Sequence, residues 1–257
     1  MRFLLALWAT NLKAALALRV AFVMQTGFML LNNLLFFVFW WVMFERFEQI
    51  RGWRIEDVAV LFGVSAAGFG VAAVFAGGIP DLSRRIQDGD LDPMLTLPRS
   101  VLLQAAAART RADGFGDIVS GLLLVSFAGY GAPERLPVVL LAILLSASVF
   151  AASGVLVHSA AFWLGRIEAI ARQVGEFLIT FSVYPPPLFG GALRVLLFTV
   201  IPAGFVSYLP AQLVREFNVG TLLLAVGGSV VYAGVAYVVF HAGLRQYASG
   251  SRFGVRD

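Results

Sequence analysis

The sequence has no cysteine, a single lysine and two histidines, and only 13% of its 257 residues are charged. Without cysteine there are no disulfides, thiolate metal sites or cysteine nucleophiles. Lys13 does not lie in a glycine-rich loop, so the chain cannot hold ATP phosphates as a Walker A loop does. His158 and His241 are too far apart for a zinc site of the HExxH type. We therefore predict that this chain binds no cofactor of its own.

A short acidic alternation at Asp88, Asp90 and Asp92 resembles only the beginning of a calcium loop. An EF-hand needs glycine at its sixth position and glutamate at its twelfth. This sequence has Pro93 and Arg99 at those positions. Calcium binding is therefore not predicted.

Hydrophobic residues make up 60% of the chain. Soluble domains carry about 25% charged residues, roughly twice the share found here. The apolar runs are about 20 residues long, which is the length of a membrane-spanning helix, whereas barrel strands would alternate over about 10 residues. Backbone groups in lipid need internal partners, which helices supply. We predict an all-α integral membrane protein with a single domain, residues 1–257. The net charge of +4 is assigned to basic helix ends and not to nucleic-acid binding.

Six apolar stretches are predicted to cross the membrane. The first contains Asn32 and Asn33, and the second has Gly63 and Gly70 in small-residue pairs spaced four apart, which allow helices to approach closely. The predicted spans are residues 20–44, 58–78, 114–130, 136–164, 169–184 and 219–244.

The first 19 residues lack an unbroken apolar stretch and do not form a cleavable signal. Arg2, Thr10 and Lys13 recur at helical spacing on one face, and Trp8 lies broadly opposite. This pattern predicts a helix that lies in the membrane interface over residues 1–19, with Trp8 at headgroup depth.

Residues 188–216 are apolar enough for a seventh span, but Pro202 interrupts them. Six spans place 13 basic residues on the side of both termini and 6 on the other, which accounts for all 19. A seventh span would move the three basic residues of the tail to the other side. The positive-inside rule therefore favours cytoplasmic termini and a re-entrant helical hairpin, with a seventh span or a surface loop as alternatives. The hairpin is marked by Pro185, Pro186, Pro187, Arg194, Pro202 and Pro210.

Residues 80–100 form the longest polar stretch and nevertheless carry several aliphatic side chains. A short helix that docks in a partner's groove would use such side chains as anchors, and its arginines would set orientation. The alternative is a loop that folds back onto its own bundle. The residues singled out are Leu82, Arg84, Arg85, Ile86, Gly89, Leu91, Asp92, Leu95 and Pro98.

Other charges lie near the predicted membrane boundaries. Glu168, Arg172 and Glu176 are spaced to pair along one helix face, and Asp113 and Asp117 precede or open the third span. We interpret these charges as helix-end residues whose side chains reach the membrane surface. A functional role of intramembrane charge is the alternative.

The order of these elements resembles the permease subunits of ABC-2-type exporters. Residues 89–98, GDLDPMLTLP, are similar to the G-x-L-D-x-x-L-x-x-P pattern of a bacterial branch of these permeases. Residues 184–186, 201–202 and 208–210 are similar to the proline-containing fifth-span region of that branch. The resemblance covers essentially the whole chain.

The resemblance implies a mechanism and partners. Two permeases, identical or related, would form a bundle in the bacterial cytoplasmic (inner) membrane, with two ABC ATPase subunits beneath it. Residues 80–100 would carry the coupling helix, while ATP and magnesium would bind to the ATPase. Aromatic and aliphatic walls suit an amphipathic or lipid-like substrate, such as a drug or lipid. An intramembrane lipid-modifying enzyme and a channel or scaffold subunit are the alternatives.

Overall fold

The computed structural model describes residues 2–247, which form helices and contain no strand beyond an isolated bridge between Ile50 and Trp53. The predicted all-helical class is confirmed. The helices are α1 (Arg2–Ala17), α2 (Arg19–Arg46), α3 (Ile55–Phe75), α4 (Leu82–Asp88), α5 (Asp92–Leu95), α6 (Val101–Ala106), α7 (Asp113–Val125), α8 (Leu136–Ser159), α9 (Ala161–Leu164), α10 (Glu168–Ser182), α11 (Gly191–Thr199), α12 (Leu209–Arg215) and α13 (Val219–Gln246). Short 3-10 or π-helical turns cover Ile79–Asp81, Ser126–Tyr130, Pro133–Arg135, Pro186–Leu188 and Gly204–Tyr208.

Within residues 2–247, four helical stretches are long and apolar enough to cross a membrane. They are α2, α3, the stretch Pro133–Leu164 that contains α8, and α13. A fifth is possible if α11 and Gly204–Arg215, which are bent by 74°, count as one broken span. The sequence predicted six. The two other predicted spans fall on α7 and α10, which have 13 and 15 residues and are shorter than the roughly 20 that a straight span needs.

Helix α3 is the centre of the bundle. Other helices bury 78% of its most apolar window, whereas only 17% is buried in α2 and in α13. Helix α3 packs against α7, α8, α2, α10 and α12. A helix that is apolar on all sides is stable only inside protein or lipid, so α3 takes the interior and the outer helices present apolar faces outward.

Glycine allows α3 and α7 to touch through their backbones. A Cβ atom on Gly121 would lie 2.4 Å from the carbonyl oxygen of Gly63, and one on Gly70 would lie 2.5 Å from that of Gly114. Neither distance is compatible with a side chain. The small-residue pairs of the second predicted span therefore do bring a neighbouring helix into close contact, as predicted.

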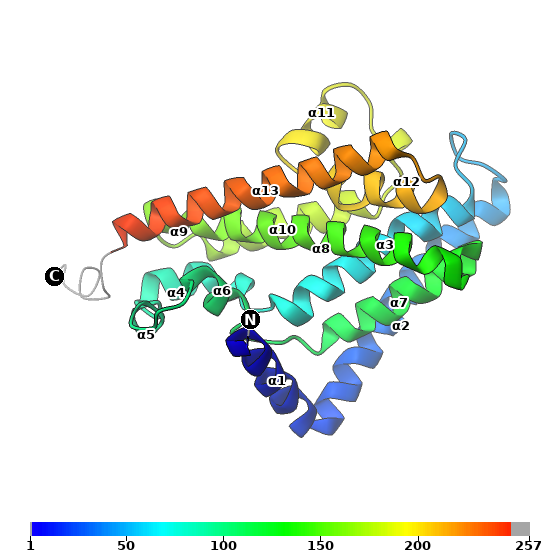
Figure 1. Cartoon of the computed structure of the whole chain (residues 1–257). Helices are drawn as coiled ribbons and strands as arrows, with labels where there is room; N and C mark the ends of the chain where they lie inside the picture. Colours follow the sequence, from blue (N-terminus) through cyan, green and yellow to red (C-terminus); the bar gives the residue numbers. More distant parts are fainter. Residues whose placement is uncertain (1, 248–257) are drawn as a thin grey trace.

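Helix α1 forms a V with α2 at the bottom of the view in Figure 1. The indole Nε1 of Trp8 donates a hydrogen bond to the carbonyl oxygen of Phe75 at 2.8 Å, and the Asn11 amide donates to that of Ala107 at 2.7 Å. These bonds fix α1 to the ends of α3 and α6. The interfacial position of α1 stays a prediction.

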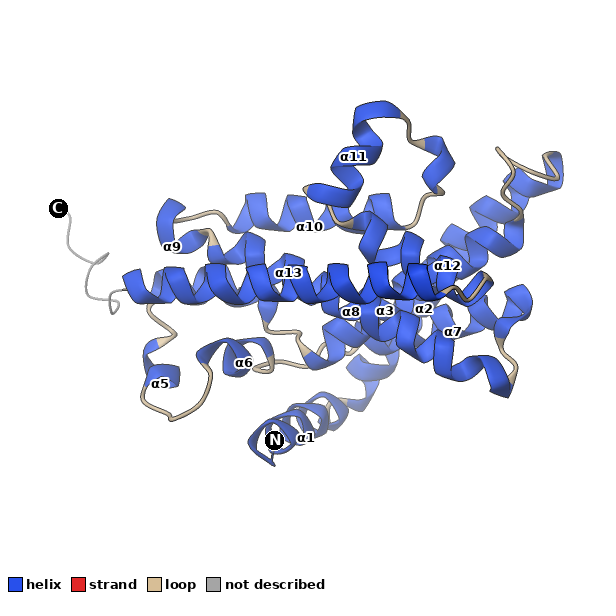
Figure 2. Cartoon of the chain, turned by 45° about the horizontal axis from the view of Figure 1, so that its top comes forward, coloured by secondary structure: helices blue, strands red, loops and turns tan. Residues whose placement is uncertain are grey.

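The two ends of the bundle carry different elements. Helices α4, α5, α6 and α9 lie with the end of α13 at one end, and the loop between α2 and α3 lies at the other (Figures 1 and 2). At this second end Arg215 pairs with Asp57 at 2.7 Å, and Arg51 donates to the carbonyl oxygen of Pro187 at 2.6 Å. These bonds fasten both ends of the predicted hairpin to the α2–α3 loop and the start of α3.

Candidate coupling segment and apolar cavity

The predicted coupling segment, residues 80–100, folds into two short helices, α4 and α5. Helix α4 ends at Gly89, whose φ of +82° is the left-handed conformation that closes many helices and that glycine adopts at little cost. Helix α5 begins directly at Asp92 and Pro93, and proline is favoured in the first turn of a helix. The glycine and proline of this stretch therefore set where the chain turns.

The aliphatic side chains of α4 and of the turn that follows it point into the protein. Leu82 and Ile86 of α4, and Leu91 after it, are at most 5% exposed and pack with Val155 of α8 and Phe240 of α13. The expectation that Ile86 and Leu91 project outward as anchors for a partner is therefore wrong. They hold the segment against its own bundle, because that surface offers apolar contacts along α8 and α13.

Other residues of the segment face outward. Leu95 and Leu97 are each 47% exposed, and Arg84 and Pro98 are exposed as well. Arg85, Gly89 and Asp92 are half-buried. Asp92 lies near the end of α13, where burial and the adjacent carboxylate raise the pKa of Tyr247 to about 12.

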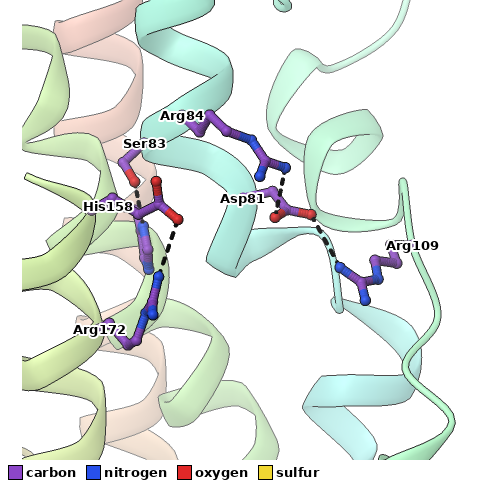
Figure 3. A network of polar contacts seen from close by, with 7 residues as sticks. Asp81, Ser83, Arg84, Arg109, His158 and Arg172 are labelled. Carbon is purple, nitrogen blue, oxygen red and sulfur yellow. Dashed lines mark hydrogen bonds and ion pairs between the residues drawn. The ribbon is translucent and has the colours of Figure 1, made fainter. Parts of the chain in front are cut away.

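Polar contacts join the beginning of the segment to two other parts of the chain (Figure 3). The Asp81 carboxylate pairs with Arg84 at 3.0 Å and with Arg109, before α7, at 3.6 Å. The Ser83 hydroxyl lies 3.0 Å from Nδ1 of His158 on α8, and both side chains are buried. A buried hydrogen bond of this kind contributes about 0.5–1.5 kcal/mol, while exposed ion pairs contribute about 0–1 kcal/mol. The Ser83–His158 contact is therefore the firmer link.

His158 of this network also lines an apolar cavity with a volume of about 530 Å³. Arg172 of α10 lines it and pairs with Glu168 at 3.3 Å, as the spacing predicted. Ile79 and Pro80, which directly precede α4, line it as well. The remaining wall includes Phe69 and Phe150, together with Tyr232 of α13 and residues 200–202 after α11. The predicted coupling segment thus begins at the wall of the cavity.

The predicted hairpin contributes another part of this wall. Residues 200–202, between α11 and the following π turn, line the cavity. The hydroxyl of Tyr208 donates to the carbonyl oxygen of Phe181 at 2.9 Å, and that of Tyr232 donates to the Thr199 carbonyl oxygen at 2.6 Å. Pro185, Pro202 and Pro210 are buried, and Pro186 and Pro187 are half-buried. The side chain of Arg194 lies outside what the structure describes.

Asp117 departs from the sequence-based interpretation. Its side chain was expected to reach the membrane surface, but it is only 2% exposed and accepts a hydrogen bond from Asn33 of α2 at 2.7 Å. Helix α7 begins inside the bundle because the preceding loop is fastened to α3: the backbone N–H of Arg111 donates to the Ala73 carbonyl oxygen. The sequence feature that could have indicated this buried position is the polar pair Asn32–Asn33, which interrupts an apolar run.

These features define a helical membrane protein with an apolar cavity and a short helical segment that begins at its wall. Residues 30–251 match the family described as ABC-2 family transporter protein. The chain belongs to this family, and it is a transmembrane permease of an ABC transporter. Family membership implies pairing with an ABC ATPase subunit. Neither the curated proteins nor the solved structures gave a match.

The burial of Ile86 leads to a prediction about stability. Ile86→Asp places an unpaired carboxylate in the apolar cluster and should destabilise the permease by on the order of 3–5 kcal/mol. Leu97→Asp, at an exposed position of the same segment, should change stability by about 0.5 kcal/mol or less. Thermal unfolding of the purified variants in detergent measures both effects. An Ile86→Asp protein that unfolds at the wild-type temperature would contradict the packing described here.

Proposed function

We propose that this chain is the permease subunit of an ATP-driven exporter and that residues 80–100 couple a separate ATPase to the translocation path. One observation carries the proposal. Ile79 and Pro80 line the cavity, and the helix that directly follows them lies at the end of the bundle with Arg84 exposed. A single continuous stretch of chain therefore joins a surface that a partner can contact to the wall of the cavity.

The packing of α4 suits the transmission of movement. Leu82 and Ile86 lock α4 onto α8 and α13, and the Ser83–His158 contact adds a polar link to α8. A force on the exposed side of α4 would move these helices with it, because packed helices resist deformation. The exposed Leu95 and Leu97 are the apolar contacts for the ATPase in this proposal, with Arg84 setting orientation. ATP and magnesium bind to the ATPase.

The proposed topology has six spans, with both termini in the cytoplasm of a bacterium and the chain in its inner membrane. Helix α7 with the π turn Ser126–Tyr130, and helix α10, supply the two shorter spans. Residues 188–216 form a re-entrant hairpin on the outer side. Two observations support this arrangement: the charge asymmetry along the sequence, and the contacts of Arg51 and Arg215 at the end remote from α4.

A second permease and the surrounding lipids are the proposed partners besides the ATPase. The outward faces of α2 and α13 are apolar, with Phe28, Leu35, Leu223 and Val230 each more than half exposed. Such surface is stable against lipid or against another apolar helix. The second permease is either another copy of this chain or a related one.

The proposed substrate is amphipathic or lipid-like. The cavity wall is mostly aliphatic and aromatic, with His158, Arg172 and Glu176 among its few ionisable residues. A pocket of this composition buries the apolar body of a ligand and orients it through a small number of polar groups.

The absence of cysteine allows a direct test of the coupling surface. Leu97→Cys, labelled with a photoactivated cross-linker, should form a covalent product with the co-purifying ABC ATPase, because Leu97 is exposed on the proposed docking side. Phe47→Cys is the matched control, since Phe47 is also exposed but lies in the loop at the opposite end. A product at Phe47, or none at Leu97 in an intact complex, would move the coupling surface elsewhere.

The topology is tested by fusing a phosphatase that is active only outside the cytoplasm. A fusion after Asp257 should be inactive, and a fusion after Arg215 should be active, because the two positions lie on opposite sides in the six-span arrangement. High activity at Asp257, with the fusion protein confirmed as full-length, would rule this topology out.

A further inference from the structure

A second, smaller cavity lies beside the first, between α2, α3, α7, α8 and α10. Its volume is about 280 Å³, and it shares Phe69, Phe150 and Ile179 with the larger cavity. The rings of Phe69 and Phe150 stand edge to face with their centres 5.4 Å apart. These two rings therefore form part of the boundary between the two chambers.

Asp117 of α7 lines this smaller cavity. One carboxylate oxygen, Oδ1, accepts a hydrogen bond from the Asn33 amide at 2.7 Å, and the same amide also donates to Ser120 at 2.8 Å. The other oxygen, Oδ2, is buried and has no hydrogen-bond partner within residues 2–247. An unsatisfied carboxylate oxygen inside an apolar bundle costs several kcal/mol or more if it carries charge. An ionisable residue at such a place calls for a partner.

The composition of the cavity wall indicates the chemistry of that partner. Five aromatic rings surround the space, and no lysine, arginine or histidine lines it among the residues that the structure describes. Arg111, whose charge acts on Asp117 from outside this wall, is already paired with Asp113. Aromatic faces attract organic cations, and a carboxylate adds the compensating charge. The five rings belong to Phe36, Phe62, Phe69, Phe150 and Tyr184.

We propose that this cavity binds the positively charged group of an apolar organic ammonium ion, with Asp117 as its counter-ion and the aromatic rings around it. The inference rests on the proposed export function, for which it names the substrate class. The larger apolar cavity then holds the hydrophobic body of the same molecule. The Asn33 amide holds Oδ1, so Oδ2 is the carboxylate oxygen that remains without a protein partner.

The test uses the purified permease alone, in detergent, with radiolabelled phenyltrimethylammonium as the probe. We expect saturable binding to the wild type and an affinity at least about tenfold weaker in Asp117→Asn, which removes the charge and keeps the shape. Asp88→Asn, at the exposed end of α4 and outside the cavity wall, should bind like the wild type. tert-Butylbenzene, the neutral molecule of the same shape, should compete far less well than unlabelled cation.

A second variant keeps the proposal falsifiable if Asp117→Asn does not fold. Phe62→Leu removes one ring of the cage without touching the carboxylate and should weaken binding by several-fold, with folding checked by thermal unfolding. Wild-type affinity in a folded Asp117→Asn or Phe62→Leu protein would overturn the proposal. So would equal competition by the neutral molecule or a lack of saturable binding to the wild type. In each of these cases Asp117 is a structural link between α2 and α7.

Binding to the purified permease needs no ATPase, so the two proposals fail separately. Loss of cation binding together with intact cross-linking at Leu97 would refute only the ammonium site. Cation binding without any cross-link to an ATPase would refute the coupling role and leave the site in place.

Discussion

The close approach of α3 and α7 is the constraint on which the rest of the structure depends. Glycine at positions 63, 70, 114 and 121 leaves the two backbones in contact, and any side chain at Gly121 would push the helices apart. The contact places α7 deep in the bundle, which brings Asp117 to Asn33 in the middle of α2. Helix α3 also supplies Phe69 to both cavities. The shape of both cavities and the position of Asp117 beside the smaller one therefore depend on glycine at these four positions.

Residues 79–91 connect the cavity wall to the surface of the bundle. Residues 79–91 leave the end of α3, pass the cavity wall and fold onto α8 and α13 through Leu82, Ile86 and Leu91. Burial on one face makes this segment part of the bundle, while Arg84 and the following residues 95–98 stay accessible. A segment built in this way is stiff, and its movement is shared with two long helices. This is the mechanical basis of the proposed coupling.

The sequence predicted those features that depend on local properties. Long apolar runs gave the helical membrane class and its longest helices, and the motif at residues 89–98 led to the family that residues 30–251 match. The direction of Ile86 could not be predicted, because a seven-residue helix with aliphatics on one face fits its own bundle and a partner's groove equally well. The depth of Asp117 was misjudged, because the loop before α7 enters the bundle. The cavities are lined by residues from helices that are far apart in the sequence, so no local motif could predict them.

The central claim is that an ATPase drives a change in this permease's cavity. The most direct measurement places a single cysteine at Val174, which lines the larger cavity, in the otherwise cysteine-free chain. The permease is reconstituted in vesicles with its co-purified ATPase, and the rate of alkylation by a membrane-impermeant maleimide is followed with and without ATP. We expect ATP to change this rate, and we expect the change to disappear when the ATPase is left out. A rate that is the same under all three conditions would contradict ATPase-driven movement of the cavity wall.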